Sequence, residues 1–165
     1  IFLWCLEAQR KGMVITMSKL YDFLHPVSVA EEKEVVVSRR FVQRDDKGEP
    51  ILDKNGDMIP KPFKVKALPQ AENDTLVKAA TLTYKDRTGA KVKDFDRQKY
   101  VRSLIVAATV EPDFRDKALC EGFGTLNPEE VPGKMLLAGE FQKLADAISE
   151  LSGFDDDSAE EEAKN

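Results

Sequence analysis

The chain has 165 residues, of which 42% are hydrophobic and 33% charged, an ordinary balance for one globular domain with short flanking segments. The formal net charge of -5 comes entirely from residues 155–165, because acidic and basic side chains balance in the rest of the sequence. A neutral body has no overall basic excess to attract nucleic acid, and no stretch approaches the roughly 20 apolar residues of a membrane helix.

Both ends of the chain are predicted to lie outside the folded domain. Residues 1–16 precede Met17, after which the sequence reads like an ordinary protein start, so they are predicted to be a non-native or disordered leader. Residues 155–165 are rich in Asp and Glu and are predicted to form a disordered acidic tail, with a specific docking role the less favoured interpretation. A single domain is expected over residues 17–154.

The first half of this domain has the signals of a small antiparallel sheet. Val35–Val42 is rich in β-branched residues, and Phe63–Leu68 alternates apolar and basic side chains, so these two segments are predicted to pair. Between them, Asn55-Gly56 predicts a type I′ hairpin turn that brings Ile51-Leu52 beside Met58-Ile59. Nearby prolines make this arm an edge feature.

Helical signals dominate from Pro69 onward. A first helix is expected to begin at Pro69 and to continue towards Tyr84, and residues 85–93 are expected to form a solvated basic linker. Asp94 is the expected N-cap of a largely apolar second helix that ends near Val110, before Pro112. Further helices are expected at residues 116–121, from Pro128 with a break at Pro132, and at residues 142–151.

The stretch from Pro132 to Phe154 combines more helix start, stop and burial signals than any other. Gly139 is expected to be the N-cap hinge of the last helix, whose buried stripe contains Leu144 and Ile148. Gly153 is expected to end that helix, with Phe154 folding back in a Schellman-type cap. The predicted fold class is therefore α+β: an N-terminal antiparallel hairpin or small sheet followed by a bundle of about four to five helices.

Residues with catalytic or metal-binding spacing are missing from the sequence. The only histidine is His25, and the two cysteines, Cys5 and Cys120, lie far apart without metal-ligand spacing. The serines lack a nucleophile-elbow motif. No catalytic, metal-binding or cofactor-binding residue is therefore predicted, and the protein is not expected to be an enzyme.

Several segments, taken in order, resemble the XkdN-like family of bacteriophage tail assembly chaperones. The matching stretches are Val36–Phe41, Phe63–Leu68, the helix at residues 94–110, Phe114-Arg115-Asp116 and Lys134–Phe141. Two departures are conservative: Ala138 stands where proline is more usual, and Phe141 where tyrosine is more usual. The resemblance covers residues 20–154.

This resemblance implies a non-enzymatic chaperone that keeps the phage tape measure protein soluble while the tail assembles. It implies a protein that works in the cytoplasm of the bacterial host and is absent from the mature virion. It also allows the tail tube protein, a frameshifted long form of the chain itself, or a second copy as partners, and it implies neither a cofactor nor a membrane partner.

The physical basis expected for such a role is an exposed apolar groove among the C-terminal helices. Plain core packing is the competing interpretation for each candidate lining residue. The candidates are Phe114, Leu119, Phe123, Met135, Leu136, Leu137, Phe141 and Leu144.

Two other functions stay open at the level of sequence. The first is a structural component of the phage tail. The second is a small nucleic-acid-binding regulator in which Arg39, Arg40, Lys64 and Lys66 line a strand pair, although a sheet with one wet face is the more favoured interpretation of these residues.

Overall fold

The computed structural model of the chain describes residues 20–21, 23–24 and 32–154. The leader predicted at residues 1–16 and the acidic tail predicted at residues 155–165 lie outside the described residues. The chain divides into residues 1–31 and residues 32–165, and the fold below belongs to the second unit. No helix among the described residues is both long and apolar enough to cross a membrane.

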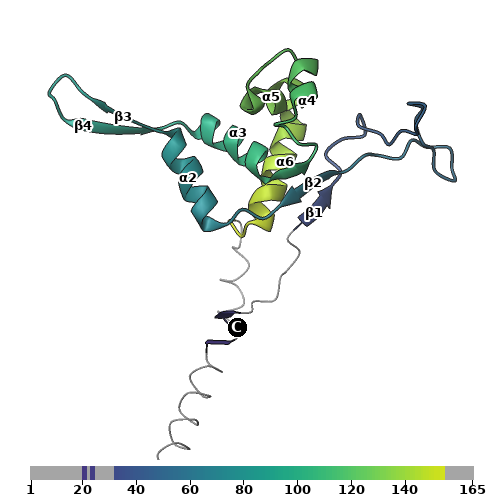
Figure 1. Cartoon of the computed structure of the whole chain (residues 1–165), viewed down its shortest axis with the longest axis horizontal. Coiled ribbons are helices and arrows are strands. Elements are labelled where there is room, and N and C mark those ends of the chain that lie inside the picture. The colour runs from purple at the N-terminus through teal and green to yellow at the C-terminus, as the bar shows by residue number, and fades with distance from the viewer. Residues whose placement is uncertain (1–19, 22, 25–31, 155–165) are drawn as a thin grey trace, which may run out of the picture. The chain divides into compact units, whose positions relative to one another are not determined.

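A three-stranded antiparallel sheet brings together three segments of this unit that are distant in sequence (Figure 1). Its strands are β1 (Glu32–Val35), β2 (Phe63–Lys66) and β5 (Thr109–Glu111), in the order β1-β2-β5. The predicted antiparallel pairing of Val35–Val42 with Phe63–Leu68 is met in this sheet only at Val35, which lies opposite Phe63. The rest of β1 is formed by the charged residues that precede Val35. The boundary predicted at Val42 is wrong because the chain leaves the sheet after Val35. Val37 then enters the core, and Lys143 Nζ donates to the Val36 carbonyl over 2.6 Å.

Strand β5 was not predicted, because its residues extend the apolar run of the preceding helix. That helix, α3 (Arg97–Ala108), ends two residues before the predicted Val110. Thr109 and Val110 are β-branched and favour extended backbone. Thr109 lies opposite Val65 of β2, so the end of α3 is joined directly to the sheet.

An arm of paired extended chain links β1 to β2. Bridges join Val42 to Pro60, Arg44 to Pro50 and Leu52 to Met58, so the predicted pairing across the arm is confirmed. The predicted type I′ turn is not observed: the Gly56 N–H donates to the Asp53 carbonyl, which puts Lys54 and Asn55 at the two central positions.

The same loop occurs three times, each time opened by an aspartate and containing a glycine with positive φ. It spans residues 45–49, 53–57 and 86–90. In each loop the aspartate Oδ1 accepts the backbone N–H groups two and four residues later, over 2.8 to 3.0 Å. The glycines have φ between 81° and 87°, a region where a Cβ is unfavourable. Three Asp-x-x-Gly segments therefore encode three tight chain reversals.

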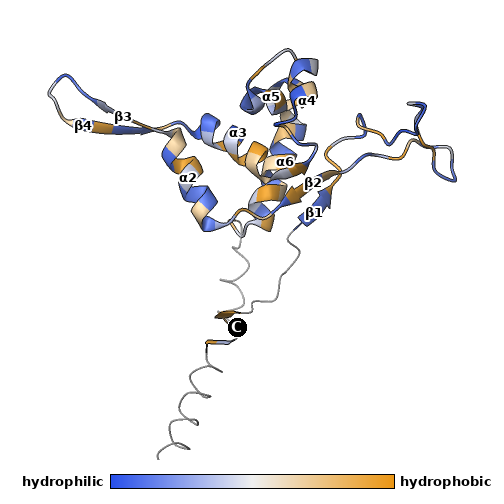
Figure 2. Ribbon diagram, in the orientation of Figure 1, coloured by the Kyte–Doolittle hydropathy of each residue, from blue (hydrophilic) through white to orange (hydrophobic). Residues whose placement is uncertain are grey.

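The region predicted to be a continuous helix and a linker forms a helix and a hairpin instead. Helix α2 (Gln70–Ala80) ends at Ala80, and strands β3 (Thr81–Lys85) and β4 (Lys91–Phe95) pair in an antiparallel ladder. The Asp86–Ala90 loop closes this hairpin. The hairpin extends away from α2 and α3, and its tip is hydrophilic (Figures 1 and 2).

The helices begin close to the predicted positions, with two shifts in the capping residue. Asp96, and not Asp94, caps α3 by accepting the Lys99 N–H over 2.9 Å. The last helix, α6 (Ala138–Leu151), has Leu137 and not Gly139 at its N-cap. Between α3 and α6 lie α4 (Lys117–Gly122), the 3-10 turn η1 (Pro128–Glu130) and α5 (Val131–Met135), so a break near Pro132 is confirmed as a change of helix type.

The end of α6 has the predicted cap. Gly153 has φ 78°, its N–H donates to the Glu150 carbonyl, and the Phe154 N–H donates to the Ser149 carbonyl. These two bonds define a Schellman motif.

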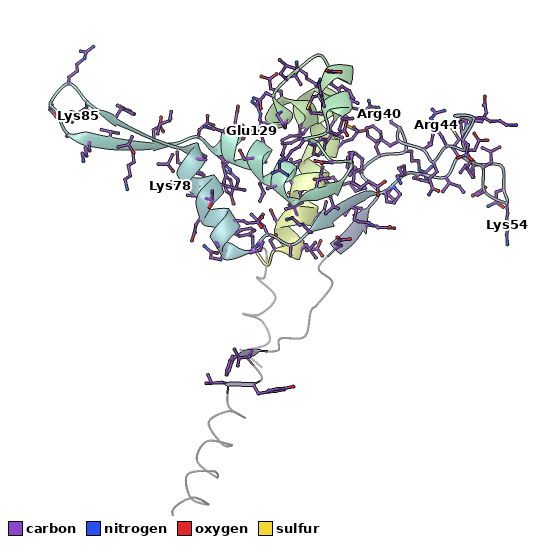
Figure 3. The ribbon with its side chains drawn as sticks, in the orientation of Figure 1. Arg40, Arg44, Lys54, Lys78, Lys85 and Glu129 are labelled. Atoms are coloured by element: carbon purple, nitrogen blue, oxygen red, sulfur yellow. The ribbon has the colours of Figure 1, made fainter. Side chains whose placement is uncertain are left out.

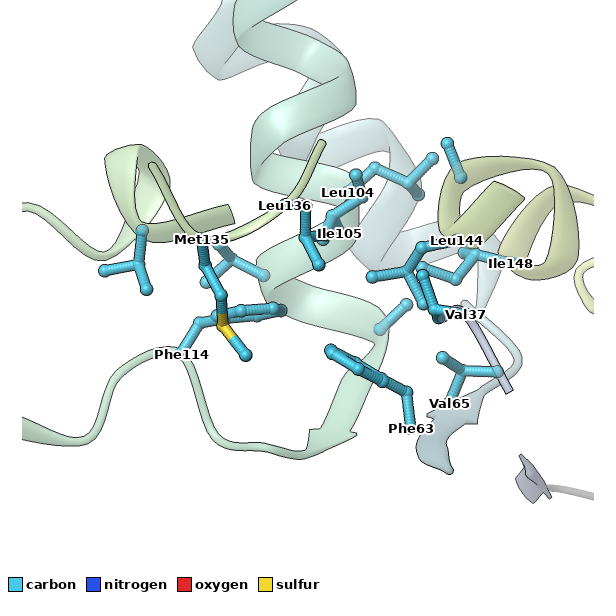
Figure 4. Packing of buried hydrophobic residues seen from close by; sticks show 14 of the residues in the cluster. Val37, Phe63, Val65, Leu104, Ile105, Phe114, Met135, Leu136, Leu144 and Ile148 are labelled. Atoms are coloured by element: carbon cyan, nitrogen blue, oxygen red, sulfur yellow. The ribbon is translucent and has the colours of Figure 1, made fainter. Parts of the chain in front are cut away.

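One hydrophobic core joins the sheet to α3, α5 and α6 (Figure 4). Val65, Ile105, Phe114, Leu144 and Ile148 have no exposed surface. A partly buried polar contact links α2 to α3, where the Tyr100 hydroxyl donates to Asn73 Oδ1 over 2.6 Å, and partial burial raises the pKa of Tyr100. The predicted α+β class is confirmed: small antiparallel sheets combine with helices that follow the first strands.

Candidate partner-binding cleft

A cleft of about 530 Å³ lies between α3 and the junction of α5 with α6. Most of its exposed lining is apolar. Three stretches that are distant in sequence meet here: the first turns of α3, the end of α5, and the first turn of α6. The lining residues are Arg97, Gln98, Val101, Arg102, Gly133, Leu136, Ala138, Phe141 and Gln142.

Three larger apolar side chains belong to this lining, each supplied by a different element. Val101 comes from α3, Leu136 follows α5 directly, and Phe141 lies in the first turn of α6. Val101 and Phe141 are half-buried and pack against the core. Gly133 and Ala138 carry little or no side chain, so the backbone of a ligand can approach the cleft closely at these positions.

Two arginines on α3 flank the apolar lining. Arg97 and Arg102 are exposed, and within residues 32–154 neither forms a salt bridge. Exposed cations next to an apolar cleft favour a ligand that brings both apolar and acidic side chains. Glu129 and Glu130 line a smaller neighbouring cleft together with Arg102, so the positive charge near Arg97 is less compensated.

The α5–α6 junction is held in place by Glu140. Its carboxylate accepts the Leu137 N–H over 2.9 Å, which satisfies a free donor at the start of α6. The same oxygen accepts from Arg40 Nη1 over 2.7 Å. Hydrogen bonds from Ser38 and from the Leu137 backbone, together with the Arg40 charge, lower the pKa of Glu140. The segment after β1 therefore fixes the position of the first turn of α6 beside the cleft.

The structure divides the eight candidate groove residues into three groups. Phe114, Met135 and Leu144 are buried in the core, so core packing describes them fully. Leu119 and Phe123 are half-buried against the core and do not line the cleft. Leu136 and Phe141 line the cleft, although Leu136 is itself buried in the core, and Leu137 between them is 58% exposed.

Sequence reasoning missed the contribution of α3 to this site. The sequence predicts a largely apolar helix here, and its two arginines are not singled out by that prediction. The available signal was a pair of arginines five residues apart around Val101, but its meaning depends on which elements face that side of α3.

A second cleft, of about 610 Å³, lies between β1 and α6. A salt bridge from Lys33 Nζ to Glu150 Oε2, 3.2 Å long, joins two residues of its lining. Lys143, another lining residue, donates to the Val36 carbonyl. Because charged groups that already have partners surround this cleft, it offers less to an apolar ligand than the cleft beside α3.

The residues proposed for nucleic-acid binding are mostly occupied by other contacts. Arg40 is paired with Glu140, while Lys64 Nζ lies 3.9 Å from Glu32 and Lys66 Nζ lies 3.8 Å from Glu72. Such compensated charges favour the alternative of a solvated sheet face. Over the described ranges, no group of three or more His, Cys, Asp or Glu residues is arranged to hold a metal ion.

A charged-rimmed apolar cleft on a small α+β domain is the kind of site that binds a segment of another protein. The family of phage XkdN-like tail assembly chaperone proteins matches residues 20–164, and the chain belongs to this family. It is therefore a member of the phage tail assembly chaperones.

Two relatives from Bacillus subtilis (strain 168) are similar over most of their length. The phage-like element PBSX protein XkdN is 38% identical over 140 residues, covering 82% of this chain and 86% of XkdN. The uncharacterized protein YqbN is also 38% identical, over 155 residues, covering 89% of this chain and 95% of YqbN. A crystal structure of YqbN superposes with a TM-score of 0.57 at 29% identity, covering 81% of this chain and 95% of that one.

Proposed function

We propose that this chain is a non-enzymatic holding chaperone that binds the phage tape measure protein through the cleft beside α3. The observation that carries this proposal is the cleft itself, where Val101, Leu136 and Phe141 form an apolar lining next to two exposed arginines. Membership of the tail assembly chaperone family supports the general role. The host cytoplasm, where the tail is assembled, is the proposed place of action.

The chemistry of the cleft specifies the segment that it accepts. An amphipathic helix presents apolar side chains at i, i+3, i+4 and i+7, and such a stripe fits a groove lined by apolar side chains from three elements. Acidic residues beside the stripe would meet Arg97 and Arg102. Occupation of the cleft covers the apolar face of the segment, which keeps a long helical protein from self-associating.

Co-expression with the tape measure protein tests this function. The intact chain is expected to raise the soluble fraction of the tape measure protein and to co-purify with it. The double variant Arg97→Glu/Arg102→Glu is expected to lose both effects. Leu137→Ser, which changes the exposed apolar side chain between the lining residues Leu136 and Ala138, is expected to weaken both. All three substitutions change exposed side chains, so the fold is expected to survive.

The matched control is Lys47→Glu/Lys54→Glu, which reverses two exposed charges on the arm between β1 and β2. This variant is expected to bind like the intact chain. Thermal unfolding of every variant separates lost binding from lost folding. The proposal is wrong if the intact chain neither solubilises nor retains the tape measure protein, or if the arm variant loses binding to the same degree as the cleft variants.

A further inference from the structure

The hairpin formed by β3 and β4 has two chemically different faces. Side chains alternate along a strand, and cross-strand partners point to the same face. Tyr84 and Val92 therefore share one face with Leu82 and Asp94. The other face carries Lys85, Lys91 and Lys93, followed by Phe95 at the base; we call it the lysine face.

The lysine face has no counter-charge of its own. Lys85 lies directly opposite Lys91 in the ladder, an arrangement that is unfavourable for two like charges. None of the three lysines forms a salt bridge with any residue from 32 to 154. All three are exposed, and Lys85 lies close to the tip of the hairpin (Figure 3).

The last described residue, Phe154, lies next to the base of this face. Phe154 and Ser149 line a cleft of about 520 Å³ together with Phe95, Arg97 and Tyr100. Phe95 continues the lysine face, and its ring lies 5.6 Å from that of Tyr100. The chain therefore passes from α6 into this cleft immediately before Asp155-Asp156-Asp157.

We propose that the acidic segment 155–165 docks within the same molecule onto the lysine face of the β3–β4 hairpin. The segment carries six acidic residues in two groups of three, at residues 155–157 and 160–162. The first group directly follows Phe154 in the sequence, and Arg97 lines the same cleft as Phe154. In the proposed docking, the second group meets Lys91 and Lys85. The two groups thus follow the order of the positive charges along the hairpin.

The length of the segment suffices for this contact. Eleven extended residues span at most about 36 Å, whereas the strand from Phe95 to Lys91 covers about 14 Å. A tether of this length also gives a high effective concentration, so weak ion pairs are enough to hold the segment in place.

Docking has a consequence for the partner-binding cleft, and this consequence rests on the proposed function. Arg97 lines both the cleft that Phe154 also lines and the partner-binding cleft. A docked tail therefore supplies acidic charge beside Arg97 until a partner displaces it. Docking itself does not depend on any partner and is tested without one.

The test compares backbone amide chemical shifts of the intact chain with those of a chain that ends at Phe154. Removal of the tail is expected to shift amides at residues 83–85 and 91–97 and to leave residues 42–60 unchanged. These shift differences are expected to shrink at least about threefold from 0.1 M to 1 M salt, as the screening length falls from about 10 Å to about 3 Å.

Variants in the lysines supply the second measurement. In Lys85→Gln/Lys91→Gln/Lys93→Gln, removal of the tail is expected to shift the hairpin amides little, since the charges that hold it are absent. The control Lys47→Gln/Lys54→Gln/Lys117→Gln removes the same charge elsewhere and is expected to behave like the unsubstituted chain. Because Lys85 and Lys91 repel each other, the hairpin variant is expected to stay folded.

Three results would overturn the proposal. The hairpin amides could be the same with and without the tail. The differences could grow with protein concentration, which would assign the tail to the hairpin of a second copy. The lysine variant and its control could respond alike, which would leave no role for the lysine face.

Discussion

At the scale of single residues, most buried polar groups in the described part of the chain have partners, and one does not. The Thr109 hydroxyl is buried at the start of β5 and makes no hydrogen bond with any described residue. By contrast, the buried Ser103 donates to Glu129 over 2.7 Å. An unsatisfied buried hydroxyl costs free energy that a methyl group of similar shape does not.

Thr109→Val is therefore expected to raise the free energy of unfolding by about 1 kcal/mol, because it removes a buried hydroxyl without a partner and keeps the β-branched shape. Chemical denaturation measures the change. Ser103→Ala is the control and is expected to lower stability by about 1 kcal/mol, since it leaves Glu129 without that donor. Equal effects of the two substitutions would contradict this account of Thr109.

Glu140 has a depressed pKa, so its contribution to stability depends on pH. A carboxyl whose pKa is lower in the folded state stabilises the fold above its unfolded-state pKa of about 4.3, and this contribution disappears as the pH falls through the folded-state value. Glu140→Gln is therefore expected to be less stable than the original chain at neutral pH.

Denaturation curves recorded from neutral to strongly acidic pH check this expectation. The stability difference between the two chains is expected to be constant above the usual glutamate pKa and to vanish in acid. Arg40→Gln, which removes the partner guanidinium, is expected to reproduce part of the loss. A difference that stays constant down to the lowest pH would show that Glu140 does not titrate with a depressed pKa.

At the scale of elements, the long connections are ordered by short local loops and contribute little to the core. The arm between β1 and β2 and the β3–β4 hairpin both depend on Asp-x-x-Gly loops, in which one aspartate satisfies two backbone donors. From residue 44 to residue 58 no side chain is buried. The arm therefore adds exposed surface without adding to the hydrophobic core.

Replacement of residues 44–58 by a two-residue Asn-Gly turn is expected to change the free energy of unfolding by less than about 0.5 kcal/mol. The Gln43 N–H donates to the Ile59 carbonyl, so the shortened chain keeps a paired end. Phe41→Ala is the contrasting variant and is expected to be clearly destabilising, because Phe41 packs edge-on against Phe63. A large loss of stability on excision of the arm would assign it a structural role.

At the scale of the whole molecule, residues 32–154 are organised around one core that joins β2, α3, α5 and α6. Leu144 and Ile148 of α6 belong to the same cluster as Phe63 and Val65 of β2, far away in sequence. Such a core predicts that the sheet and the helices unfold together.

Leu144→Ala is expected to lower the free energy of unfolding by about 2 to 5 kcal/mol, because it leaves a cavity in the core. Circular dichroism and amide exchange in β2 are expected to report the same transition. Leu137→Ala, seven residues earlier at an exposed site, is expected to change stability by less than about 0.5 kcal/mol. Separate transitions for the sheet and for α6 would contradict a single core.

Much of the local structure could be predicted because it depends on a few neighbouring residues. Gly153 and Phe154 predict the end of α6, and Asn127-Pro128 predicts the start of η1, since glycine and proline restrict the backbone directly. Alternation in Phe63–Lys66 predicts β2. The Asp-x-x-Gly repeat was equally readable from the sequence, and recognising it would have indicated the β3–β4 hairpin that was predicted to be a linker.

The sequence by itself thus determined the α+β class, the order of most elements and the position of strand β2, because hydrophobic periodicity and backbone restriction act locally. Only the tertiary structure decided that Thr109–Glu111 joins the sheet, which candidate groove residues are buried, and that Val101 faces Leu136 and Phe141. Those outcomes depend on which surfaces of distant segments pack together. A periodic pattern in the sequence indicates that one face of a helix or strand is apolar. Which other element packs against that face, or whether the face is left exposed in a cleft, depends on the rest of the fold.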